Sequence, residues 1–156
     1  MTALAGIIGK TKRPGELAIH SLDNFRLHVP DLRAGVDFYK AFGLDVREEG
    51  NAVGLYTKGN AHRWASLSEG PRKTLANISL GVFEEDFEPM KRHLESMGVV
   101  LLDPPAGVES NGIWLRDPVG LLVEVKVAEK TSLNAKAGFG DPSSPPNVQG
   151  APNHAN

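Results

Sequence analysis

The chain of 156 residues contains one pattern twice, with strand and helix signals in the same order. The segments are LDNFRLHVPDLRAGVDFYKAFGLDV at 22–46 and LANISLGVFEEDFEPMKRHLESMGVVL at 75–101. Each opens on Leu-x-Asn, and the two asparagines, Asn24 and Asn77, are 53 residues apart. Self-similarity at a fixed spacing is typical of repeated supersecondary units. The repeat therefore predicts two equivalent modules.

The first strand of each module has one apolar face and one polar face. Successive side chains of a strand point to opposite sides, so alternating apolar and polar residues predict a half-buried strand. The apolar positions are Phe25, Leu27 and Val29 in the first module and Ile78, Leu80 and Val82 in the second. The polar positions are Asn24, Arg26 and His28 in the first module and Asn77, Ser79 and Gly81 in the second.

A helix is expected to cover each apolar strand face. The first helix begins after Pro30-Asp31 and ends near Gly43, and the second begins with acidic residues and ends at Gly98. The apolar positions at helical spacing are Leu32, Val36, Tyr39 (or Phe38) and Phe42 in the first helix and Phe87, Met90, Leu94 and Met97 in the second.

Three further strands are predicted after each helix. They cover about 44–49, 52–57 and 62–68 in the first module and about 99–102, 107–115 and 121–127 in the second. Each module is then a βαβββ unit. The predicted fold is α+β, with two modules forming a curved mixed sheet around a half-polar cleft and the helices outside.

The predicted domain plan has four parts. They are an N-terminal extension at 1–20, module one at 21–70, module two at 74–128 and a tail at 129–156. The tail is rich in Pro, Gly and Ser, which is the composition of a disordered terminus or of a linker to another domain.

Composition excludes several classes of function. The net charge is −2 and no basic block is present, so nucleic acid is not an expected partner. No apolar run is long enough to span a bilayer, and no signal peptide is recognisable. Cysteine is absent, which excludes disulfides and thiolate metal sites and fits a cytoplasmic protein.

Two motifs resemble the vicinal oxygen chelate superfamily, which includes glyoxalase I, bleomycin-resistance proteins and extradiol ring-cleavage dioxygenases. They are HVPDLRAGVDFYKAFGLDV at 28–46 and WLRDPVGLLVEV at 114–125. The resemblance covers roughly 20–128. It implies metal ligands near the start of the first strand of each module, usually His, and a carboxylate on the closing strand.

Only the carboxylate of that ligand set has a counterpart here. Glu124 matches it, whereas the two histidine positions fall on Asn24 and Asn77. Amides bind first-row metals more weakly than imidazole does. His28 lies about 13 Å along the strand from Asn24, too far to replace it. We therefore expect no metal in this chain, and Glu124 is expected to pair with Arg26, Arg116 or solvent, because burying an unpaired carboxylate is costly.

The residues expected to face the cleft are mostly polar. They are Asn24, Arg26, His28, His62, Trp64, Asn77, Ser79, Trp114 and Arg116. None of them is expected to be catalytic.

The loss of ligands resembles the N-terminal half of two-domain extradiol dioxygenases, and GLYTKGNAHRWASLSEG at 54–70 resembles a segment of those proteins. This implies that Fe(II) would bind in a C-terminal domain outside this chain. The present domain would then be a scaffold that contacts the second domain or another copy through the edges of its modules.

Two alternatives remain open. A stand-alone, metal-free binding protein of the bleomycin-resistance type would hold a small aromatic ligand, with Trp64 and Trp114 as candidate contacts. A metal-free lyase or isomerase would need a general base, for which Glu124 is the candidate.

Overall fold

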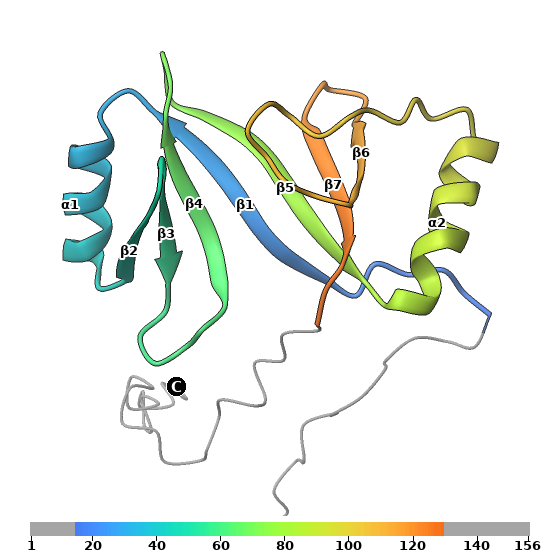
Figure 1. The fold of residues 1–156 in the computed structure, drawn as a ribbon, viewed down its shortest axis with the longest axis horizontal. Helices are drawn as coiled ribbons and strands as arrows, with labels where there is room; N and C mark the ends of the chain where they lie inside the picture. The colour runs from blue at the N-terminus through green and yellow to red at the C-terminus, as the bar shows by residue number, and fades with distance from the viewer. Residues whose placement is uncertain (1–14, 130–156) are drawn as a thin grey trace, which may run out of the picture. The chain divides into compact units, whose positions relative to one another are not determined.

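The computed structural model describes residues 15–129, which lie within one compact unit. Their strands form a single mixed sheet of seven strands in the order β2-β3-β4-β1-β5-β7-β6 (Figure 1). The first module contains β1 (Ser21–Val29), α1 (Leu32–Phe42), β2 (Asp45–Glu49), β3 (Ala52–Tyr56) and β4 (Arg63–Glu69). The second module contains β5 (Thr74–Val82), α2 (Glu84–Ser96), β6 (Ile113–Arg116) and β7 (Leu122–Val127). The predicted α+β fold is confirmed.

One predicted strand is wrong. In the second module, the segment predicted at 99–102 contributes a single bridge, between Leu102 and Trp114. The following strand begins only at Ile113, because residues 103–112 form a long loop rich in proline and glycine. Proline lacks a backbone donor and glycine weakens strands, so this composition interrupts the ladder. The second module therefore has three strands where the repeat predicted four.

The two modules meet at the antiparallel pair β1 and β5. Asn24 pairs with Ser79 and Arg26 pairs with Asn77, on either side of the pair Phe25–Ile78. A shift of 53 residues exchanges the two outer pairs and maps the central pair onto itself. The sequence repeat thus corresponds to a local twofold symmetry of the pairing between β1 and β5, at the middle of the sheet.

Each helix covers one half of the sheet and closes its own core. Val36 of α1 packs against Val53, Leu55, Ala65 and Leu67, while Met90 of α2 packs against Val82, Ile113 and Val125. The separation of α1 from α2 along the sheet is visible in Figure 1. Two predicted core positions are wrong, because Phe42 is 71% exposed and Met97 is 65% exposed.

The helix termini agree with the sequence signals. The Asp31 side chain accepts a hydrogen bond from the Ala34 amide at 2.9 Å, which caps α1. Gly43 and Gly98 follow the two helices with φ of +100° and +76°, values that a residue with a side chain rarely adopts.

The predicted tail at 129–156, except its first residue, and residues 1–14 of the N-terminal extension lie outside the described residues. Between residues 15 and 129, neither helix is long and apolar enough to cross a membrane.

Candidate functional site

A small polar hollow lies on the sheet face opposite the two helices. Its volume is about 240 Å³, and it is bounded by strands of both modules and by the loop at 107–110. Six of the residues singled out from the sequence line it: Asn24, Arg26, Asn77, Ser79, Trp114 and Glu124. Their neighbours along the strands, such as Ile113 and Val125, belong to the helix-covered core of the second module. Strand alternation therefore separates the hollow from the core.

Glu124 is buried at 5% exposure, and serine hydroxyls hold it. One carboxylate oxygen accepts a hydrogen bond from Ser79 on the adjacent strand, and the other accepts one from Ser110 in the 107–110 loop. The Ser110 hydroxyl oxygen in turn accepts from the Gly112 amide at 2.9 Å. Among residues 15–129, Glu124 forms no ion pair with an arginine within 4.0 Å. Neither Arg26 nor Arg116 forms the expected close ion pair, although Arg26 is near enough for a favourable charge interaction with Glu124.

The two asparagines are also engaged with neighbouring side chains. Asn77 is 4% exposed, and its amide nitrogen lies 3.4 Å from the Ser79 hydroxyl. The Asn24 amide donates to Asp23 at 2.7 Å. Asp23 is buried at 8% and lies 3.4 Å from the Lys126 ammonium, which also lines the hollow.

Sequence patterns missed Asp23, Lys126 and Ser110. Asp23 was missed because the β1–β5 ladder shifts register between Leu22 and Asn24, and such bulges break strict alternation. Ser110 was missed because it approaches from a loop. The only available signal for Asp23 was an acidic residue inside an otherwise half-apolar strand.

The donor set is a poor fit to a divalent transition metal. The three positions that correspond to family ligands supply two amides and one carboxylate, and both oxygens of that carboxylate already accept hydrogen bonds. Imidazole and free carboxylate are the donors that such metals prefer. Within the described part of the chain, no group of three or more His, Asp or Glu residues could hold an ion.

The other predicted cleft residues lie outside the hollow. The His62 ring nitrogen Nε2 lies 2.7 Å from the Asp23 carbonyl oxygen, and the Trp64 ring packs edge-on against His62 with centroids 4.5 Å apart. The Arg116 guanidinium donates to the Gly120 carbonyl at 2.8 Å in the β6–β7 turn. These three residues therefore make contacts with their own surroundings and not with the hollow.

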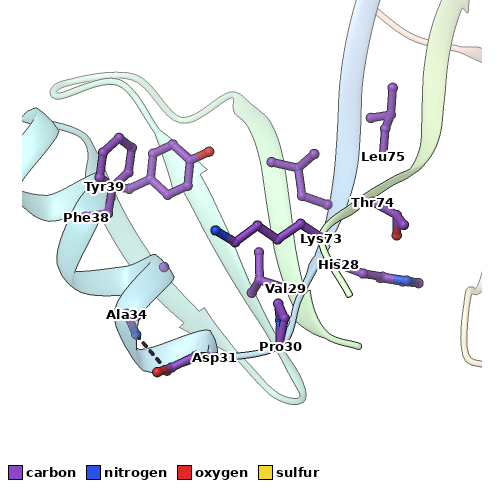
Figure 2. Close-up of a pocket in the computed structure, with 12 residues that line it drawn as sticks. His28, Val29, Pro30, Asp31, Ala34, Phe38, Tyr39, Lys73, Thr74 and Leu75 are labelled. Atoms are coloured by element: carbon purple, nitrogen blue, oxygen red, sulfur yellow. Dashed lines mark hydrogen bonds between the residues drawn. The ribbon is translucent and has the colours of Figure 1, made fainter. Parts of the chain in front are cut away.

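His28 borders a second, larger hollow of about 690 Å³ between α1 and the start of β5. Figure 2 shows Phe38 and Tyr39 on the helix side, Lys73 extending toward α1, and His28 pointing away from the helix. Most of the lining is apolar, including Leu27, Val29 and Leu75. Of its ionisable lining residues, Asp31 caps α1 and His28 points away from the helix (Figure 2).

Arg63, which also lines the small hollow, belongs to a hydrogen-bonded group at its edge. The Glu49 carboxylate accepts from the Arg63 guanidinium at 2.7 Å and from the Tyr56 hydroxyl. Burial alone would raise the pKa of Glu49, but the hydrogen bonds from Tyr56 and then Arg63 outweigh it, so the pKa lies below its usual value. The same hydrogen bond raises the pKa of Tyr56.

This group predicts a pH-dependent contribution to stability. Because the folded-state pKa of Glu49 is lowered, its contribution is present above the unfolded value of 4.5 and is lost as pH falls through the folded value. We expect Tyr56→Phe to reduce the free energy of unfolding by about 1–2 kcal/mol at about pH 7 and by less at about pH 3. Urea unfolding at both pH values measures this. An equal loss at both would contradict the assignment.

The serine contacts of Glu124 make a second prediction. Ser79→Ala leaves one oxygen of a buried carboxylate without its donor, so we expect a loss of about 1–3 kcal/mol in the free energy of unfolding. Ser68→Ala is the matched control, because the Ser68 hydroxyl is buried without a hydrogen-bond partner among the described residues. That change should stay within about 0.5 kcal/mol. Equal losses in urea unfolding would mean that Ser79 does not stabilise the carboxylate.

Comparisons with known proteins agree with this architecture. Residues 21–125 match the family model of the glyoxalase/bleomycin resistance protein/dioxygenase superfamily. Metapyrocatechase 2 of Cupriavidus necator is 38% identical over 135 residues, which cover 86% of this chain and 40% of that protein.

Two solved structures have the same fold. The 2,3-dioxygenase LapB from Pseudomonas sp. KL28 gives a TM-score of 0.60 at 18% identity, covering 72% of this chain and 43% of that one. The Mn(II)-bound glyoxalase from Novosphingobium aromaticivorans gives 0.59 at 20% identity, covering 74% of this chain and 43% of that one. This chain thus spans less than half the length of each of these three proteins.

The family match covers more than half of the chain, and the predicted resemblance to dioxygenases of this group is confirmed. The chain belongs to the glyoxalase/bleomycin resistance protein/dioxygenase superfamily.

Proposed function

We propose that this chain is the metal-free N-terminal half of an extradiol ring-cleavage dioxygenase that acts on catechol-type substrates. The observation that carries the proposal is the set of residues at the ligand positions. Asn24 and Asn77 are amides, and Glu124 already accepts from two serines. The 38% identity to a metapyrocatechase over 40% of its length supports the same assignment.

In this proposal the reaction belongs to the second domain, where bound Fe(II) would bring a catechol and O₂ together. The present domain contributes a rigid sheet. Ser79 and Ser110 hold the Glu124 carboxylate inside the fold, so both of its oxygens are already engaged. The residues at 129–156 would connect the two halves.

A role in assembly is the second part of the proposal. Strands β2 and β6 are the outermost strands of the sheet, and outermost strands can pair with another chain or domain. We propose that they contact a second domain or another copy. Sedimentation velocity tests self-association of the chain, and a monomer at all concentrations would contradict the homo-oligomer.

An assay of ring cleavage by the isolated chain tests whether the reaction requires the second domain. The purified 156-residue chain, supplied with Fe(II) and catechol, is expected to give no yellow ring-opened product. Metapyrocatechase 2 of Cupriavidus necator under the same conditions is the positive control. The genomic sequence after codon 156 is expected to encode, in frame, a domain with two histidines and a glutamate. Product formed by the chain alone would overturn the proposal.

The alternative of a stand-alone binding protein for bulky aromatic ligands receives less support. Trp114 is 1% exposed and offers no open ring face, and Trp64 packs against His62. The hollow of about 240 Å³ beside Trp114 is also below the roughly 300–1,000 Å³ typical of drug-sized ligands, and the hollow of about 690 Å³ is lined by neither tryptophan.

A further inference from the structure

The loop at 103–112 ends on a dipeptide that can react with itself. Asn111 is followed by Gly112, and no other asparagine of the sequence precedes a glycine. The backbone nitrogen that follows an asparagine can attack the side-chain amide carbon and close a cyclic imide. Glycine favours this attack, because it has no side chain in the way and the widest choice of backbone angles. The dipeptide is therefore a candidate modification site.

The Asn111 side chain is not held away from that reaction. Asn111 is exposed and lies outside the helices and strands. Within residues 15–129, its side-chain amide takes part in no hydrogen bond or ion pair. The side chain can thus turn toward the Gly112 nitrogen, and water can reach the product.

Packing around the buried carboxylate requires the glycine. A Cβ added at Gly112 would lie 2.7 Å from Glu124 Cγ and 2.8 Å from Glu124 Oε1, closer than real Cβ atoms approach. Glu124 cannot easily move aside, because hydrogen bonds from Ser79 and Ser110 hold it. The contact that buries Glu124 therefore also places a glycine after Asn111.

A chain of hydrogen bonds links the Gly112 amide to the same carboxylate. The Gly112 N–H donates to Ser110 Oγ at 2.9 Å, and the Ser110 hydroxyl donates to Glu124. The Gly112 nitrogen must lose its proton when it attacks. Ser110 can take that proton while it passes its own to the carboxylate. A positioned base of this kind typically accelerates a reaction by roughly 10²–10⁴-fold.

We propose that Asn111 is a site of self-catalysed deamidation, in which Ser110 and Glu124 remove the proton of the Gly112 amide. A bond forms between the Gly112 nitrogen and the side-chain carbonyl carbon of Asn111. The carbon–nitrogen bond of the side-chain amide then breaks, and the proton held by Glu124 leaves with ammonia. Water opens the imide at either of its carbonyl carbons, which leaves an aspartate or an isoaspartate at position 111.

This modification goes beyond the proposed role as a metal-free half, because it requires only water. It also changes the site. An isoaspartate lengthens the backbone between Ser110 and Gly112 and adds a negative charge there. The modified loop would therefore withdraw Ser110 from Glu124 and release one carboxylate oxygen.

Incubation of the purified chain at neutral pH, followed by tryptic peptide mapping with mass spectrometry, tests the proposal. The peptide 93–116 contains no glutamine and no asparagine other than Asn111, so its conversion to the acid form reports on this residue alone. We expect the acid and isoaspartate forms to accumulate with first-order kinetics. Ser110→Ala and Glu124→Gln should each slow the reaction at least about tenfold. Glu124→Gln keeps the shape of the side chain, so its slowing would report the loss of the base.

Two further comparisons separate the proton relay from a structural effect. Ser79→Ala is the matched control, because it removes the donor to the other oxygen of Glu124 and leaves the contacts of Ser110 in place. It should not slow the reaction. Heavy water should slow the parent chain by a larger factor than the Ser110→Ala variant, since only the parent moves protons through the hydroxyl.

Three results would overturn the proposal. A reaction as fast or faster in Ser110→Ala or Glu124→Gln would mean that these hydrogen bonds protect the amide. Equal slowing in Ser79→Ala would indicate a general loss of packing. A folded parent chain that reacts no faster than the same chain unfolded in urea would exclude the relay, and this comparison holds even if Ser110→Ala fails to fold. The reaction involves neither Fe(II) nor a catechol, so its failure and that of the proposed function can be distinguished.

Discussion

Leu67→Ala is expected to reduce the free energy of unfolding by about 2–5 kcal/mol. Leu67 is fully buried in β4, where it packs with Val36 of α1 and with Val53 and Leu55 of β3. The helix approaches it closely, because a Cβ added at Gly35 would lie 3.2 Å from a Leu67 methyl carbon. Removing the side chain would leave a cavity between α1 and the sheet that this packing cannot easily fill.

Chemical denaturation with urea measures the loss, and Leu75→Ala is the matched control. Leu75 is 44% exposed at the start of β5, so the same truncation should cost less than about 1 kcal/mol. A domain of this size has a total stability of about 5–15 kcal/mol, so the Leu67 variant would lose a large part of it. Similar losses in both variants would contradict the assignment of Leu67 to the centre of module one.

Histidines at the two asparagine positions are expected to create a metal site. Asn24 and Asn77 are diagonal neighbours on β1 and β5, and Glu124 lies on the next strand, β7. Diagonal cross-strand neighbours are about 7–8 Å apart, within reach of side chains that converge on one ion. The poor fit to a metal therefore lies in the identities of these residues and not in the backbone that positions them.

The variant Asn24→His/Asn77→His/Ser110→Ala supplies two imidazoles and frees one oxygen of Glu124. We expect it to bind one Co²⁺ per chain with visible absorption bands, while the parent chain shows none. Adding Glu124→Gln to the variant is the control and should abolish the bands. Bands that persist in that control, or that appear equally in the parent, would show that the three positions do not converge.

The arrangement of the modules could be predicted from the sequence because the repeat is also a spatial symmetry. The shift of 53 residues that relates Asn24 to Asn77 also relates the pairs Asn24–Ser79 and Arg26–Asn77 in the sheet. Strand alternation then predicted correctly that these four polar residues share a face.

The sequence predictions that were wrong or incomplete have local causes, which the periodicity of the sequence does not reveal. At 100° per residue, Phe42 lies about 80° around α1 from Leu32, close to the direction of Phe38. Its side chain therefore lies away from the core and stacks on the ring of Phe38. The partners of Glu124 depend on a loop that carries Ser110 back to the sheet. Asp23 reaches the polar face through a bulge.

Metal analysis of the purified chain tests the central claim most directly. The chain, expressed in medium with iron, manganese and zinc, and its Glu124→Gln variant are assayed by inductively coupled plasma mass spectrometry. We expect metal far below one ion per chain and the same value in both proteins, since Glu124 is held by serines and the other two positions are amides. One ion per chain in the parent, lost in Glu124→Gln, would contradict it.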